Sequence, residues 1–167
     1  MAEGLVLDVN IDEILEFASD LENGPRVIAR NMRATMRKSL PVLEHSIVAR
    51  TPVNIGALRG SISHEMRGQG VDLYGRVFSP LEYGAAVERG RRPGRMPPID
   101  AIQYWVERKG IAGDEDPRQV AFLIARAIGR RGTKGAFMFR DGLEAARPRV
   151  VRLWMDMGHN IVEELVR

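Results

Sequence analysis

Cysteine is absent from this 167-residue chain, which excludes disulfide bonds and every reaction that needs a thiolate. No apolar run approaches the ~20 residues that a helix needs to span a bilayer. The start of the sequence, Met1-Ala2-Glu3-Gly4, also lacks the basic residues and apolar core of a signal peptide. We therefore expect a protein without membrane contact that stays in the reducing cytoplasm in which it is made.

The composition indicates one folded domain over residues 1–167. Hydrophobic residues make up 44% of the chain, enough for a real core, and a folded chain of this size buries about 70% of its unfolded surface. The 25 basic and 22 acidic residues give a formal net charge of +3. This excess permits contact with nucleic acid or an acidic partner without demanding it, because binding depends on where the charges cluster.

The first residues predict a strand followed by a helix. Leu5–Val9 alternates in a way typical of a short strand. Asn10 is a good helix N-cap, with Glu13 placed to complete a capping box. We expect this helix to reach about Glu22 and to stop at Asn23-Gly24-Pro25.

A second, longer helix is expected from Pro25, which suits a first turn. Its apolar residues recur at steps of three or four, namely Ile28, Met32, Met36, Leu40, Leu43 and Ile47. Pro41 interrupts this stripe and predicts a kink or break near Ser39. Thr51-Pro52 should end the helix.

The period changes to two from Ser61, which predicts an antiparallel hairpin over about residues 61–79. Gly68-Gln69-Gly70 turns the chain, and Ser79-Pro80 closes the second strand. The alternating apolar positions are Ile62, Met66, Val71, Leu73 and Val77.

The second half of the chain is predicted to be mainly helical. Leu81–Gly90 is too short to assign, and the proline-rich and arginine-rich stretch Arg89–Pro98 is expected to be a loop. Helices are predicted over Ile99–Lys109, ended by Gly110, and from Asp116-Pro117 to about residue 131. We interpret residues 99–131 as a helical insertion.

A last helix is expected from about Asp141 to the end of the chain, with a bend at Pro148. The predicted class is therefore α+β: a small antiparallel sheet packed by a long N-terminal helix, the helical insertion and a C-terminal helix.

Candidate catalytic and metal-binding groups are few. His45, His64 and His159 show no metal-ligand spacing. We interpret them as ordinary surface or half-buried histidines, although the sequence leaves open a general-base role that depends on partners met in the fold. We expect no enzyme activity, no cofactor and no metal.

Two short segments resemble ligand-binding loops and have plainer interpretations. Asp114-Glu115-Asp116 lacks the alternating oxygen ligands and central glycine of a calcium loop, so we interpret it as a helix cap. The run from Gly129 to Gly135 has the glycines and Lys134 of a phosphate loop, but it follows a helix instead of a strand. We expect a helix end with cations near its carbonyls, followed by a turn.

The strongest charge feature is the run Arg89, Arg91, Arg92 and Arg95. These arginines could neutralise phosphates without reading bases, or pair with carboxylates of a neighbouring subunit. The third interpretation is a solvated loop. No aromatic residues are interleaved with them in the manner that stacks single-stranded bases.

Three passages together resemble one known family. They are Ala49–Ile62, with its Thr51-Pro52 and Gly56-Ala57-Leu58; Tyr83–Gly90, with Glu88 before Gly90; and Lys134–Leu143, with Phe137. Their order and spacing are similar to those of the neck, or head–tail joining, proteins of long-tailed bacteriophages. That family also takes in relatives of the lambda minor tail protein Z.

The resemblance covers roughly Ala49 to Arg147. The sequence departs from the family pattern at three positions: Ile55 stands where threonine is usual, Arg89 where an apolar or aromatic residue is common, and Ala136 where proline is expected. The residues that carry the resemblance, and that we interpret as structural, are Pro52, Gly56, Leu58, Ser61, Ile62, Tyr83, Val87, Gly90 and Phe137.

Physical reasoning assigns these residues simple roles. Gly56 should permit a tight turn, and Leu58 and Ile62 should anchor the hairpin under the long helix. Tyr83 and Val87 are expected to pack an edge segment, which leaves Glu88 and the arginines facing outward.

The resemblance implies a virion protein of the neck or tail top, synthesised in the host cytoplasm. It would form a six- or twelvefold ring with itself, join neighbouring neck and tail proteins and surround the DNA channel, with non-specific contact to packaged DNA. The candidate subunit-interface or DNA-channel residues are Glu88, Arg89, Arg91, Arg92 and Arg95. The alternatives are a small basic nucleic-acid-binding domain and, with less support, a small enzyme.

Overall fold

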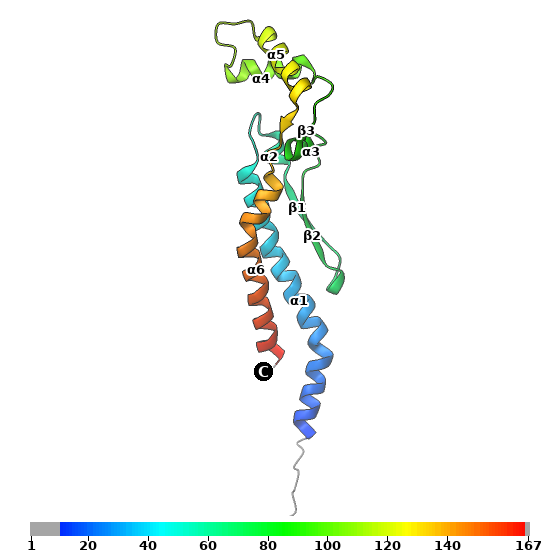
Figure 1. Ribbon diagram of the computed structural model, residues 1–167. Coiled ribbons are helices and arrows are strands. Elements are labelled where there is room, and N and C mark those ends of the chain that lie inside the picture. The colour runs from blue at the N-terminus through cyan, green and yellow to red at the C-terminus, as the bar shows by residue number, and fades with distance from the viewer. Residues whose placement is uncertain (1–10, 166–167) are drawn as a thin grey trace, which may run out of the picture. The chain divides into compact units, whose positions relative to one another are not determined.

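The computed structural model describes residues 11–165 and gives an α+β fold (Figure 1). The described residues form six α-helices and two two-stranded ladders, and 67% of the chain is helical. The elements are α1 (Ile11–Arg50), α2 (Ala57–Ser61), β1 (Ser63–Arg67), β2 (Tyr74–Phe78), α3 (Gly84–Arg89), β3 (Gly90–Arg91), α4 (Ile99–Lys109), α5 (Pro117–Arg131), β4 (Thr133–Lys134) and α6 (Met138–Leu165). The strand predicted at Leu5–Val9 and the cap at Asn10 lie outside the described residues.

The chain forms two compact units, and the long elements contribute to both. The first unit contains α1 as far as Val42, the hairpin segment Glu65–Arg76 and α6 from Pro148 onward. The second unit contains Leu43–His64 and Val77–Arg147. The expectation of a single domain stays a prediction.

Helix α1 continues through Gly24, Pro25 and Pro41, so the predicted stop at residues 23–25 and the break near Ser39 are wrong. A proline inside a helix removes one backbone hydrogen bond. Around Pro41 this loss is offset by packing, because Leu40, the residue directly before the proline, is only 4% exposed. The buried Ser39 hydroxyl also finds an acceptor, the carbonyl oxygen of Thr35 at 2.9 Å.

In the first unit, strand β2 and helix α6 both lie against α1 (Figure 1). Gly75 of β2 sits so close to α1 that a β-carbon there would lie 2.8 Å from the side chains of Met36 and Leu40. Near the other end of the unit, Glu164 of α6 accepts hydrogen bonds from Arg30 and Asn31 of α1. The hairpin predicted over 61–79 is confirmed, although its turn extends through a 3-10 helix at Gly70–Asp72.

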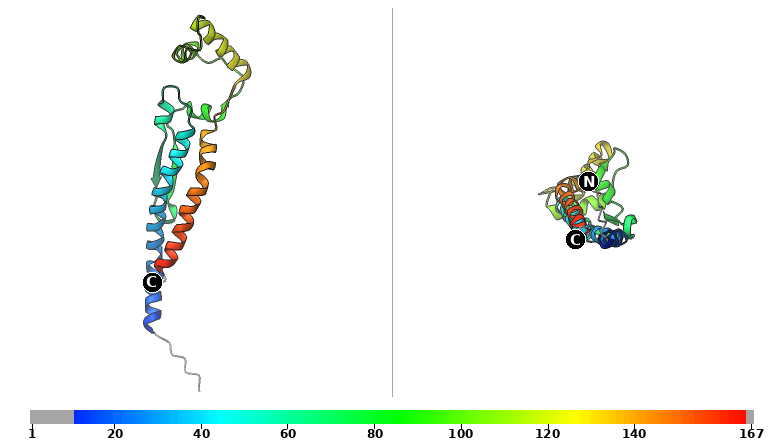
Figure 2. Two further views of the ribbon diagram at one scale, coloured as in Figure 1. Left: turned by 90° about the vertical axis from the view of Figure 1, so that its left-hand side faces the viewer. Right: turned by 90° about the horizontal axis from the view of Figure 1, so that it is seen from below.

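In the second unit, the end of α1 packs on the start of α6 (Figure 2). A β-carbon at Gly142 would lie 2.6 Å from Cγ1 of Ile47 and 2.8 Å from its Cα, so only glycine allows this approach. The Ser46 hydroxyl donates to the Gly142 carbonyl at 2.8 Å. Helix α1 ends as predicted, with the hydroxyl of buried Thr51 donating to the carbonyl of Ile47.

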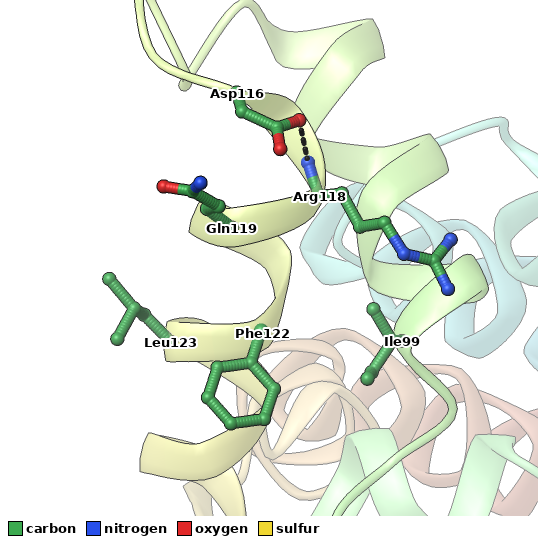
Figure 3. A pocket seen from close by; sticks show the side chains of 6 residues that line it. All are labelled: Ile99, Asp116, Arg118, Gln119, Phe122 and Leu123. Carbon is green, nitrogen blue, oxygen red and sulfur yellow. Dashed lines mark hydrogen bonds between the residues drawn. The ribbon is translucent and has the colours of Figure 1, made fainter.

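Helices α4 and α5 pack on each other and match their predicted positions. Gly110 ends α4 with a φ of 62°, and the side chain of Asp116 accepts a hydrogen bond from the Arg118 N–H at 3.0 Å (Figure 3). Val106 and Ala121 are fully buried between them. Local capping signals therefore sufficed to place both helices.

Helix α6 begins at Met138, about three residues before the predicted start, and passes Pro148 without a break. None of the helices in the described part of the chain combines the length and the apolar character that a membrane crossing needs.

Candidate functional site

A short antiparallel ladder, not predicted from the sequence, joins two basic segments in the second unit. Strand β3 pairs with β4, with Gly90 opposite Lys134 and Arg91 opposite Thr133. The ladder brings the arginine-rich loop beside the end of α5, although these segments lie about forty residues apart in sequence. We call β3, β4 and the adjoining residues 89–95 and 130–134 the basic ribbon. These segments contain seven cations: Arg89, Arg91, Arg92, Arg95, Arg130, Arg131 and Lys134.

Backbone geometry at glycines makes this pairing possible. Gly90 has a φ of 77° and Gly132 a φ of 73°, in the region that residues with a side chain rarely adopt. A β-carbon at Gly132 would lie 2.0 Å from the carbonyl oxygen of Arg91. The loop is held further along by a hydrogen bond from the Gly94 N–H to the Gly129 carbonyl at 2.8 Å.

All seven ribbon cations are exposed, and none forms an ion pair within the described part of the chain. The Arg91 guanidinium donates only to the carbonyl oxygen of Arg95, at 2.8 Å. Removing these seven charges from the formal net charge of +3 would leave −4.

Glu88 is the acidic residue closest in sequence to the ribbon arginines. It was predicted to face outward with them, and this prediction is wrong. Its carboxylate accepts hydrogen bonds from the backbone N–H groups of Phe139 at 2.9 Å and Arg140 at 3.2 Å. These are donors of the first turn of α6, which have no partner inside the helix. Glu88 is thus occupied as a helix cap, and its charge is directed to the start of α6.

The same contact region unites two of the passages that carry the family resemblance. The N–H of Ala136 donates to the carbonyl of Val87 at 2.8 Å, and the N–H of Phe137 to the carbonyl of Glu88 at 3.0 Å. Phe137 has a φ of 50°, a conformation that is uncommon for a residue with a side chain. The guanidinium of Arg140 lies 4.0 Å from the centre of the Phe137 ring and covers it.

The remaining passage, Ala49–Ile62, lines a cleft with α3. This cleft of about 430 Å³ is bordered by the loop Pro52–Leu58, by Tyr83 and Val87, and by Trp105 of α4. Gly56 turns the loop with a φ of 85°, as predicted. The prediction that Tyr83 and Val87 pack an edge segment is wrong, because both lie at helix α3 and Tyr83 is 48% exposed.

Leu58 and Ile62 are buried as predicted, with 6% and 5% of their surface exposed. Leu58 lies within a helix that the sequence did not predict, α2, and Ile62 directly follows its last residue, Ser61. The Ser61 hydroxyl donates to the carbonyl of Leu58 and is within 2.8 Å of the Ser79 hydroxyl. Ser61 therefore belongs to a helix end and not to the start of the first strand.

A second cleft, of about 420 Å³, lies on the α4–α5 pair (Figure 3). Its walls are mostly apolar, with the exposed side chains of Phe122 and Leu123 beside Ile99. Asp116 and Arg118 lie at its border, where the carboxylate caps α5. The cleft therefore offers mainly apolar surface for contact. Asp116, the one carboxylate among its lining residues, already accepts a hydrogen bond as the cap of α5.

The histidines do not gather at either cleft. His64 Nδ1 lies 2.5 Å from a carboxylate oxygen of Glu44, and both side chains are about one-third exposed. His159 contacts the Met155 carbonyl on its own helix. Within the described residues, no three histidine or acidic side chains are grouped so that they could hold a metal ion.

Comparisons with protein-family models, with curated proteins and with solved structures gave no significant match.

Proposed function

We propose that this protein is a structural subunit of a long-tailed bacteriophage, located in the virion at the neck or tail top. It would form a ring, join capsid and tail, and surround the DNA channel after synthesis in the host cytoplasm. The proposal rests on the resemblance of residues 49–147 to the head–tail joining family. No chemical step is part of it.

The observation that carries the proposal is the meeting of the three resembling passages in one region. The loop after α1, helix α3 and the start of α6 are distant in sequence. Helix α3 nevertheless meets both of the others, because Tyr83 and Val87 line a cleft with the loop after α1, and Val87 and Glu88 accept hydrogen bonds from the residues around the start of α6. Residues with a common structural task are expected to lie together in this way, whereas chance similarities have no reason to do so.

The basic ribbon gives a second, weaker support. A closed cyclic ring uses two different patches on each subunit, one against each neighbour. An exposed cluster of seven cations that form no ion pair with the described carboxylates is suited to be one of these patches.

Mass photometry and negative-stain electron microscopy of the purified full-length chain test the proposal. We expect closed rings with six or twelve times the 18.7 kDa mass of the chain. If the protein stays monomeric at all concentrations, including in mixtures with portal and tail proteins of the same phage, the proposal is wrong.

The basic ribbon also favours a second candidate function, that of a small nucleic-acid-binding domain. It predicts that affinity for mixed-sequence duplex DNA falls steeply with salt, with a logarithmic slope of about −0.9 for each phosphate contact. Changing Arg91, Arg92 and Arg95 to alanine should weaken binding and flatten that slope. Equal binding by the triple variant and the wild type would remove this candidate.

A further inference from the structure

The charges of the chain are divided along the sequence. Residues 1–25 contain seven acidic residues and no lysine or arginine: Glu3, Asp8, Asp12, Glu13, Glu16, Asp20 and Glu22. Residues 26–167 contain all 25 basic residues and the other 15 acidic ones. We call residues 1–25 the acidic segment. One molecule therefore carries a strongly acidic stretch and a strongly basic one.

We infer that the acidic segment of one copy binds the basic ribbon of the next copy in the ring. This inference rests on the proposed ring function and names the contact that would close it. The segment and the ribbon carry equal and opposite formal charge, seven against seven. Two complementary patches on the same subunit are what a head-to-tail ring requires.

The ribbon is a better partner than the basic stretch from Arg26 to Lys38 on α1. In that stretch Arg30 already forms an ion pair within the molecule, with Glu164. The ribbon cations have no such ion pairs in the part of the chain that the structure describes. Glu88, which directly precedes Arg89 in sequence, caps α6.

The arrangement of the ribbon also suits an extended or helical acidic chain. The ladder holds cations from two segments beside each other, so several carboxylates can be paired at the same time. Arginine favours such contacts because its planar guanidinium binds a carboxylate through two hydrogen bonds. The contact should be sensitive to salt, since exposed charges are screened within about 10 Å at 0.1 M ionic strength.

A charge exchange between two full-length variants tests the contact. In the first variant, Asp12→Lys, Glu16→Lys and Asp20→Lys change the formal charge of the acidic segment from −7 to −1. In the second, Arg91→Glu, Arg92→Glu and Arg95→Glu change the formal charge of the ribbon from +7 to +1. Each variant alone removes most of the charge attraction and places like charges at the substituted positions, so we expect its half-assembly concentration to rise at least about tenfold.

Mixing the two variants restores opposite charges at every contact of an alternating ring. We therefore expect equimolar rings of the two variants in mass photometry, with each copy labelled by a different mass tag. A matched control carries Arg147→Glu, Arg149→Glu and Arg152→Glu, an equal charge change at exposed positions of α6. The control should assemble like the wild type, and circular dichroism should show that all variants keep their helical content.

The outcomes separate the two proposals. If the wild type never assembles, the ring function fails and the contact fails with it. If the wild type forms rings and the second variant forms them equally well, only the contact is wrong; loss of DNA binding in that variant would then assign the ribbon to nucleic acid. Rings that are lost in both variants but do not return on mixing, or that are lost in the control as well, also overturn the contact.

Discussion

The carboxylate of Glu88 lies 2.9 Å from the backbone nitrogen of Phe139, fifty-one residues further along the chain. This hydrogen bond joins the end of α3 to the first turn of α6. Because the first N–H groups of a helix have no partner within it, a carboxylate placed there stabilises the fold.

Glu88→Ala should therefore lower the free energy of unfolding by about 1 kcal/mol, the usual loss when a helix cap is removed. Glu88→Gln keeps an oxygen acceptor and should lose less. Chemical denaturation measures both, and Glu82→Ala, at an exposed position two residues before α3, is the control. Equal stability of the Glu88→Ala variant and this control would show that the cap contributes nothing.

Two glycines of α6 should respond to alanine in opposite directions. Gly142→Ala places a β-carbon 2.8 Å from the Ile47 Cα, so overpacking should cost about 1–3 kcal/mol. Gly158 has no neighbour within 4 Å of such a carbon, and alanine there should stabilise the helix by about 0.5–1 kcal/mol. Thermal unfolding of the two variants checks this; a shift of the same sign in both would contradict the packing described at Gly142.

Gly132→Ala should disrupt the β3–β4 ladder. The substitution demands an unfavourable φ and a contact of 2.0 Å with the Arg91 carbonyl oxygen. We expect faster amide hydrogen exchange at Thr133 and Lys134. Gly94→Ala is the control, since its backbone conformation is ordinary and its surroundings are open. Unchanged exchange in the Gly132 variant would speak against the ladder.

The contact between α1 and α6 should depend on pH. The hydrogen bonds that Glu164 accepts from Arg30, and then from Asn31, hold the pKa of this carboxyl below its ordinary value. Its contribution to stability is thus present above the ordinary pKa of a glutamate and is lost as the pH falls through the lower, folded-state pKa. The effect should be small because both side chains are exposed.

Glu164→Gln should accordingly lower the free energy of unfolding slightly at neutral pH, and the difference from the wild type should disappear in acid. Denaturation curves at several pH values between about 7 and 3 measure this trend around the ordinary glutamate pKa. Glu163→Gln, at the neighbouring exposed position, is the control. If the stability difference between Glu164→Gln and the wild type grew as the pH fell, the proposed role of this contact would be contradicted.

The parts of the fold that were predicted well depend on local chemistry. Helices α4 and α5 begin and end where Asp116, Pro117 and Gly110 indicate, because each cap involves only its own helix. The predicted interruptions of α1 at its prolines were wrong because the outcome there depends on packing between elements and not on local chemistry alone. The local cost of Pro41 is real, but packing of the surrounding turns outweighs it, and the sequence pattern gives no measure of that balance.

The candidate site could be predicted only in part. The arginines are visible in the sequence, whereas the ladder that places Arg91 beside Thr133 is not, because strands of two residues have no period to detect. The role of Glu88 depends likewise on a contact with a helix far along the chain. Its neighbours in sequence suggested exposure, and nothing local signalled a cap.

The ladder that carries the arginines is built from main-chain atoms and glycines, and the guanidinium groups contribute almost nothing to it. The residues that hold the ladder together are therefore different from the side chains that give this surface its charge. Substitution of these arginines by lysines, polar residues or even acids should leave the ladder in place, whereas Gly90 and Gly132 must be kept. Specificity at this surface can evolve without rebuilding the fold beneath it.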